Sequence, residues 1–187
     1  MKLILGSKSP RRKELLASIG YEFEVRTKET DESYPENLPI EEVAEYIAQL
    51  KADDLKEELK EDEILICADT TVEIDAILLG KPTDALEAEK MLNLLSGRTH
   101  NVTTGVVLVS SEMEISFSVK TEVTFKSLSL DEIRYYISNY KPFDKAGSYG
   151  IQEWIGYIGI EKINGSYNNV VGLPTHEVYQ AIQTFLS

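Results

Sequence analysis

The feature that most constrains the fold is an uninterrupted apolar run, Ile64–Ala68, which is closed by the polar stretch Asp69–Thr71. A strand with one solvated face alternates apolar and polar residues, so a continuous apolar run indicates a strand buried on both faces. Such a strand needs helices above and below it. The run therefore predicts a central strand of an α/β protein, with Asp69 at its end.

The segments around this run alternate between strand and helix patterns. Ser9-Pro10 is typical of a helix start, because Ser caps and Pro suits the first helical position. Asn164-Gly165 predicts a hairpin between strands at 155–163 and 167–171. Other strands are expected at residues 3–5, 21–25, 72–74, 77–79, 102–109 and 115–125, and other helices after Pro39, Asp84, Ser129 and Pro174. The pattern predicts a mixed sheet with flanking helices. Without an internal repeat or linker, residues 1–187 are expected to form one domain.

The charge of the chain limits its partners. Its 19 Lys and Arg residues oppose 32 Asp and Glu residues, which gives a net charge of −13. A chain this acidic binds nucleic acid polymers and anionic membranes poorly, so neither is an expected partner. It would also repel a nucleotide unless a local cationic pocket or a bound metal overcame its field.

Compartment signals favour the cytoplasm. The single cysteine, Cys67, excludes an intramolecular disulfide and fits a reducing compartment. No apolar run approaches the roughly 20 residues of a membrane span, and Leu3–Leu5 is too short for the core of a secretion signal. With one Cys and two His residues, a zinc site built on Cys and His is not expected.

Basic residues gather at Ser7–Lys13, between a strand and a helix. Helix N-termini prefer acidic side chains, so three cations in a first turn of an acidic protein are a local conflict that a bound anion would resolve. Backbone N–H groups, two hydroxyls and two guanidinium groups would then converge on phosphate. A solvated basic turn is the alternative.

Two carboxylates are candidates for chemistry. Asp69 follows a buried strand, which is where α/β proteins place functional residues. The alternative is an aspartate that hydrogen-bonds within a turn or bulge. Glu32 lies in an acidic loop, where most carboxylates are simply solvated.

Three further features are weak when taken alone. Lys81, in Gly80-Lys81-Pro82, could reach phosphate as a point charge, although most such lysines are surface residues. The loop Asp144–Gln152 contains glycines that allow close approach to a ligand, and an amide that could pair with a base edge. Lys51 falls on the polar side of a helix. His100 and His176 are not expected to be catalytic, and the chain lacks a P-loop sequence.

In their order along the chain, these motifs resemble the Maf family of nucleotide pyrophosphatases. The matching stretches are Ser7–Arg12, Ala68–Thr70, Gly80–Pro82, Leu95–His100, Asp144–Gln152 and Val171–Pro174. The resemblance implies a fold similar to that of the inosine triphosphate pyrophosphatases, an elongated mixed sheet with helices that form two lobes around a cleft. It also implies a nucleoside triphosphate diphosphatase that releases a monophosphate and pyrophosphate.

The resemblance also implies roles for individual residues. Asp69 is the expected proton acceptor, and it would act either as the base itself or by holding a metal-bound water. Glu32 is a candidate second carboxylate beside the Mg²⁺ or Mn²⁺ ion. Arg11, Thr70 and Gln152 stand at positions linked to substrate choice. Phosphate contacts are expected from Ser7, Ser9, Arg12, Lys51, Lys81 and Lys145.

The substrate branch is indicated by the form of the Asp144–Gln152 loop, which is similar to that of enzymes acting on dTTP and UTP. CTP and modified pyrimidine nucleotides are further candidates. Cys67 and Glu153-Trp154 depart from the family pattern, which more often has glycine at both places. Two other functions compete with this one: a nucleotide-binding regulator of septum formation, and a phosphatase that releases orthophosphate. The sequence leaves open whether the chain forms a homodimer.

Overall fold

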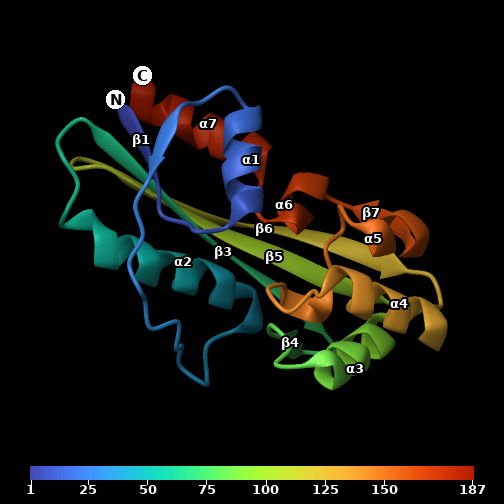
Figure 1. The fold of residues 1–187 in the computed structure, drawn as a ribbon. Coiled ribbons are helices and arrows are strands. Elements are labelled where there is room, and N and C mark those ends of the chain that lie inside the picture. Colours follow the sequence, from blue (N-terminus) through green and yellow to red (C-terminus); the bar gives the residue numbers. More distant parts are fainter. The chain divides into compact units, whose positions relative to one another are not determined.

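The computed structural model describes residues 1–187, whose seven strands form a sheet in the order β2–β1–β3–β5–β6–β7, with β4 beside β3 (Figure 1). The strands are β1 (Lys2–Leu5), β2 (Phe23–Val25), β3 (Glu63–Ile74), β4 (Ile77–Leu79), β5 (Thr99–Val109), β6 (Glu114–Phe125) and β7 (Ile160–Asn164). The helices are α1 (Pro10–Ser18), α2 (Ile40–Lys56), α3 (Ala85–Leu95), α4 (Leu130–Tyr140), α5 (Trp154–Gly159), α6 (Tyr167–Val171) and α7 (Thr175–Leu186), with a 3₁₀ turn, η1 (Ala146–Ser148).

The sheet is mixed, as predicted. Strand β1 runs parallel to β2 and to β3, and its Leu5 pairs with Val25 on one side and Ile66 on the other. Parallel neighbours need long crossover connections, which α1 and α2 provide. Strands β3 and β4, and strands β6 and β7, pair antiparallel.

The chain divides into two compact units. Unit 1 comprises residues 1–70, 103–119 and 172–187, and unit 2 comprises residues 71–102 and 120–171. None of the helices combines the length and the apolarity needed to span a membrane.

Unit 1 contains two apolar clusters, one on each face of its strands. Leu5 and Ile66 pack with α1 and α7, whereas Ile4 and Cys67 pack with α2; Figure 1 shows α2 on the side of these strands opposite α1 and α7. Side chains alternate between the faces of a strand, so a continuous apolar run is what two covered faces require. The prediction of a strand buried on both faces is confirmed.

The covering helix α2 approaches the sheet closely at Gly105. A Cβ atom on this residue would lie 2.2 Å from the backbone nitrogen of Glu45. A glycine in a strand commonly marks such an approach by another backbone. Any larger residue would displace the helix that carries Lys51.

Gly6 makes a similarly close approach, in this case to the thiol of Cys67. The thiol is fully buried, and a Cβ atom on Gly6 would lie 2.4 Å from its Sγ. The thiol therefore occupies the space that a side chain at position 6 would fill. Burial raises the pKa of the Cys67 thiol to about 12.

Unit 2 has one core, formed by α3, α4 and the ends of the long strands. The hairpin between β3 and β4 turns through Asp75 and Ala76, both left-handed at φ 52° and 60°. Two predicted helix starts are confirmed by their caps. Ser129 accepts from the N–H of Glu132 in a full capping box, and Asp84 accepts from the N–H of Glu87 at 2.8 Å.

Three segments differ from the expectations. Strand β3 continues through Asp69 to Ile74 instead of ending at Asp69. An ion pair from Lys51 compensates the carboxylate, so the strand tolerates it without a turn. Residues 154–159 and 167–171 are helices, not strands.

Close packing explains both short helices. A Cβ atom on Gly156 would lie 1.7 Å from the carbonyl oxygen of Ile151, an approach that only a glycine permits. Helix α6 buries Asn169, whose amide donates to the carbonyl of Val102 at 3.1 Å and to Thr121 Oγ1 at 2.9 Å. Gly165, at φ 131°, directs the chain into this helix rather than into a hairpin.

An ion pair between a buried carboxylate and a partly exposed guanidinium lies at the start of β3. Arg26 donates two hydrogen bonds of 2.9 Å to the two carboxylate oxygens of Glu63, which is 1% exposed. These bonds are the main cause that lowers the pKa of Glu63 from 4.5 to about 2. A carboxyl group with a lowered folded-state pKa contributes stability above its unfolded pKa. That contribution is complete at neutral pH and is lost as the pH falls from about 4.5 to about 2.

We predict that Glu63→Gln lowers the free energy of unfolding by about 1.5–3 kcal/mol at pH 7, because it removes the charge from two hydrogen bonds that Arg26 donates to a buried side chain. The difference from wild type should shrink as the pH falls to about 2. Urea denaturation at a series of pH values measures both effects. Glu24→Gln is the control, since its pair with Lys2 is solvent-exposed. An equal difference at pH 7 and pH 2 would contradict the prediction.

Candidate active site

In the link from β1 to α1, both serine hydroxyls accept hydrogen bonds from backbone N–H groups. Ser9 caps α1 by accepting from the N–H of Arg12 at 3.4 Å, and Pro10 takes the first helical position. The Ser7 hydroxyl, which is buried, accepts from the N–H of Ser9 at 3.2 Å. The predicted helix start is confirmed, and the first turn of α1 holds no acidic residue.

Arg12 is directed into the protein rather than toward solvent. Its Nε donates to the carbonyl of Gly172 at 2.8 Å, Nη2 donates to Thr70 Oγ1 at 3.0 Å, and Nη1 donates to Ser7 Oγ at 3.4 Å. Burial lowers the pKa of Arg12, while the nearby charge of Asp69 acts in the opposite direction. The guanidinium has five N–H donors, so these three contacts leave two of them for a ligand.

A second group lies on the other face of β3. The Nζ of Lys51, on α2, lies 2.6 Å from Asp69 Oδ1 and 2.9 Å from Glu32 Oε1. Lys51 and Asp69 are mostly buried, whereas half of the Glu32 side chain is exposed. One ammonium group is thus held between two carboxylates.

The alternation of β3 explains why these two groups are separate. Cys67 belongs to the cluster under α2, and Ala68 belongs to the cluster under α1 and α7. Continuing this alternation, Asp69 meets Lys51 on α2, while Thr70 meets Arg12 on α1 and contacts Thr104 at 2.9 Å. Two adjacent residues therefore supply two different networks.

The other predicted site residues differ in how far they are buried and in whether they are paired. Arg11 is half-buried on α1. Within unit 2, Lys81 is exposed after β4 and Gln152 is half-buried. Lys145 is buried and paired, with its Nζ 2.7 Å from Asp144 Oδ1 and 3.1 Å from Glu153 Oε1.

Sequence reasoning missed a buried group of rings in unit 2, formed by His100, Tyr149 and Phe125. The buried His100 ring approaches Tyr149 with Nε2 2.7 Å from the phenol oxygen, and Phe125 contacts both rings. Burial lowers the pKa of His100 to about 4, so the ring is neutral at pH 7. The only signal was that His100 and Tyr149 belong to separate family motifs.

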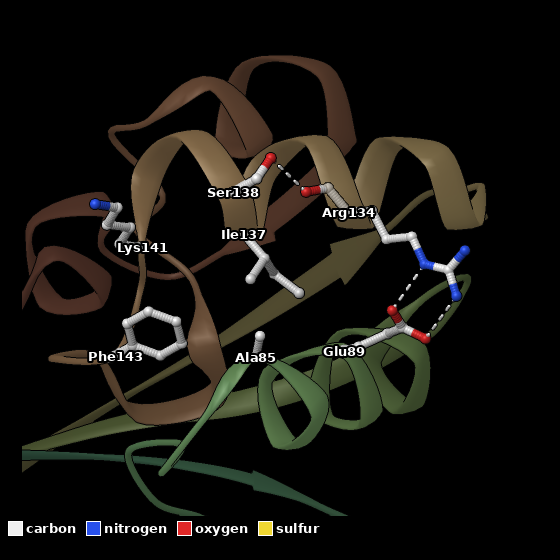
Figure 2. A pocket seen from close by; sticks show the side chains of 7 residues that line it. All are labelled: Ala85, Glu89, Arg134, Ile137, Ser138, Lys141 and Phe143. Atoms are coloured by element: carbon white, nitrogen blue, oxygen red, sulfur yellow. Dashed lines mark hydrogen bonds and ion pairs between the residues drawn. The ribbon is translucent and has the colours of Figure 1, made fainter.

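A surface hollow of about 310 Å³ lies elsewhere in unit 2, between α3 and α4 (Figure 2). An ion pair between Arg134 and Glu89 closes one end of it. Its lining is Ala85, Glu89, Arg134, Ile137, Ser138, Lys141 and Phe143. No predicted site residue lines it.

Comparison with known proteins settles the family. The family model described as Maf-like protein matches residues 2–185. The chain belongs to this family. The recognition made from the sequence motifs is therefore confirmed.

Three relatives of this Maf-like chain are named dTTP/UTP pyrophosphatase. The protein from Phocaeicola vulgatus is 51% identical over 97% of this chain and 95% of its own length. The Parabacteroides distasonis protein is 48% identical over 98% and 96%, and the Flavobacterium psychrophilum protein is 49% identical over 95% and 91%.

The fold is shared with a solved structure, the Ham1 protein of Staphylococcus aureus. It covers all of both chains with a TM-score of 0.56 at 16% sequence identity. The predicted fold class, a mixed α/β sheet with flanking helices, is confirmed.

We predict that Arg12→Ala lowers the free energy of unfolding by about 2–3 kcal/mol, because it removes three contacts of a partly buried cation. Arg12→Lys should recover only part of the loss, since an ammonium group cannot reproduce the planar fork. Urea denaturation midpoints measure both variants. Lys13→Ala, at the neighbouring cation, is the control. Equal midpoints for Arg12→Ala and Lys13→Ala would show that the three contacts add nothing to stability.

Proposed function

We propose that this chain hydrolyses dTTP and UTP at the bond between the α- and β-phosphates, releasing the nucleoside monophosphate and pyrophosphate. The enzyme class, a hydrolase of nucleoside triphosphates, follows from near-50% identity over almost the full length to proteins named dTTP/UTP pyrophosphatase. The observation that supports the chemistry is the group formed by Asp69, Lys51 and Glu32. We also propose that residues 1–187 act as one Maf-like domain.

Asp69 is the proposed general base for the attacking water. Hydrolysis at the α-phosphorus requires a water molecule to lose a proton, and a positioned carboxylate can accept it. The contact with Lys51 occupies one oxygen of Asp69. Because an ionised carboxylate has about four lone-pair sites, capacity remains to accept from water. Lys51 keeps the carboxylate oriented.

Glu32 and Asp69 are also the residues that would hold a divalent metal ion. Both carboxylates already converge on one cation, the Nζ of Lys51, and their oxygens suit Mg²⁺ or Mn²⁺. No cluster of three or more His, Cys, Asp or Glu residues could hold a metal ion. Mg²⁺ is usually bound through one or two carboxylates together with substrate phosphates. When bound, such an ion neutralises phosphate charge and lowers the pKa of bound water.

Phosphate binding is proposed for the basic residues and for the serines of the α1 start. Arg12 has two N–H donors left after its three contacts within the protein. Ser7 and Ser9 use their oxygens as acceptors, so their hydroxyl hydrogens could still donate. Lys81 is exposed and could neutralise phosphate as a point charge. Lys145 would have to share its charge with Asp144 and Glu153.

Base choice is proposed to rest on Gln152, with Arg11 and Thr70 as the other specificity residues. One amide offers a donor and an acceptor, which complements the alternating donor and acceptor groups of uracil and thymine. Phosphate contacts cannot distinguish one base from another. CTP and modified pyrimidine triphosphates are the next substrates to compare.

The product mixture separates this function from its two competitors. The protein is incubated with UTP and Mg²⁺, and the products are identified. UMP with pyrophosphate supports the proposal. UDP with orthophosphate would identify a different phosphatase, and binding without turnover would favour the nucleotide-binding regulator of septum formation.

We predict that Asp69→Asn lowers kcat by about 10²–10⁴-fold, the usual range for loss of a general base. Asparagine has nearly the same shape, so the fold and UTP binding should be retained. Pyrophosphate release and equilibrium UTP binding measure the two effects. Asp53→Asn, at an exposed carboxylate on α2, is the control. More than a tenth of wild-type turnover in Asp69→Asn would remove this residue from the catalytic role.

We predict that Gln152→Ala lowers kcat/KM for UTP by about 5- to 150-fold, the effect of losing paired hydrogen bonds to the base. The poor purine substrates should change much less, since they do not make those bonds. Pyrophosphate release from UTP, dTTP, ATP and GTP gives the comparison. Equal losses for all four nucleotides, or a wild-type preference for purines, would refute a base-reading role.

A further inference from the structure

One buried phenol holds the loop that carries Gln152. Tyr136 lies on α4 and is fully buried. Its hydroxyl donates a short hydrogen bond to Glu153 and accepts from the backbone N–H of Gly150 at 2.9 Å. Burial and the bond to Glu153 raise the pKa of Tyr136, so the phenol keeps its proton. A single oxygen atom thus fixes one residue on each side of the Ile151-Gln152 pair.

Gly150 lies at the centre of the side chains that this loop presents. A Cβ atom on Gly150 would lie 2.9 Å from Glu153 Cδ, 3.0 Å from Gln152 Nε2 and 3.0 Å from Lys145 Cε. The loop backbone is closed here as well, because the N–H of Glu153 donates to the carbonyl of Gly150 at 3.0 Å. A side chain at position 150 would therefore displace the amide of Gln152.

Glu153 extends the same network to a cation. One of its oxygens accepts from Tyr136, and the other lies 3.1 Å from the Nζ of Lys145. The side chains of Lys145 and Glu153 are 10% and 21% exposed. A mostly buried ammonium needs a charge partner, and Glu153 shares that role with Asp144, whose Oδ1 lies 2.7 Å from the same Nζ.

We propose that Tyr136 and Glu153 are positioning residues that set nucleotide selectivity by fixing Gln152 and Lys145. This inference rests on the proposed function, in which Gln152 reads the base. Neither residue acts on the nucleotide itself. Tyr136 holds Gly150 and Glu153 at one point, and this restrains the backbone from which the side chain of Gln152 extends. Without the phenol oxygen, the buried N–H of Gly150 loses its acceptor, and the loop then samples other conformations in which this N–H is paired.

The decisive variant is Tyr136→Phe, which removes one oxygen and keeps the ring that packs in the core. We expect KM for UTP to rise about 5- to 30-fold, with the selectivity for UTP over GTP falling by a similar factor, because the reading amide is no longer fixed. The value of kcat should stay within about threefold, since proton transfer at Asp69 does not involve this loop. Tyr140→Phe is the matched control, because its half-exposed ring stacks on Tyr136 from the same helix.

An independent measurement separates this inference from the proposed function. Amide hydrogen exchange at Gly150 should be at least about tenfold faster in Tyr136→Phe and unchanged in Tyr140→Phe, because only the first loses the acceptor. Unchanged exchange, or faster exchange with unchanged selectivity, would overturn the positioning role. If the wild-type protein releases no pyrophosphate from UTP, the proposed function fails; the role of Tyr136 in fixing the loop is then decided by the exchange result alone.

Glu153 supplies a second test that does not alter the buried ring. Glu153→Ala should reproduce the loss of selectivity, whereas Glu153→Gln, whose amide oxygen can still accept from Tyr136, should recover most of it. Equal effects of the two variants would mean that the negative charge of Glu153 matters and that its bond to Tyr136 does not, which would overturn the role of the phenol. This pair of variants also decides the question if Tyr136→Phe does not fold.

Discussion

The structure depends on the burial of both faces of β3. Helix α2 covers one face and helices α1 and α7 cover the other, so each residue along the strand is assigned to one side. That assignment continues beyond the apolar residues, and it brings Asp69 to Lys51 and Thr70 to Arg12. The same hydrophobic constraint that builds the core of unit 1 therefore delivers two adjacent polar side chains to two separate networks.

Charge within the candidate site is balanced locally rather than over the whole chain. The net charge of −13 gives no sign of a phosphate-binding region. Yet each of the three most deeply placed cations has a specific oxygen partner. Arg12 and Lys51 bind oxygens from distant parts of the sequence, and Lys145 pairs with Glu153 of its own loop. Because those partners orient the cations before any ligand is present, part of the ordering cost of binding is met during folding.

What could be predicted from the sequence was local. The helix starts at Ser9-Pro10 and after Ser129 depend on neighbouring residues, and both are confirmed. Arg12 shows the limit, because Gly172 and Thr70 lie 160 and 58 positions away in the sequence. The helices at 154–159 and 167–171 were missed for a related reason. Their apolar residues suit a strand, and the helices are revealed only by the close approach of Gly156 to the carbonyl of Ile151 and by the bond of Asn169 to the distant carbonyl of Val102. The roles of the candidate site residues stay predictions.

The environment of Cys67 has a practical consequence for measurement. Its thiol is fully buried against Gly6, and its pKa is raised to about 12, so almost none of it is thiolate at neutral pH. Alkylating reagents attack the thiolate, and they must also reach it. Cys67 of the folded chain is therefore expected not to react with maleimide dyes. A cysteine placed on the surface of each unit could carry a fluorophore without replacing Cys67, and energy transfer between the two would report the distance that separates the units with and without nucleotide.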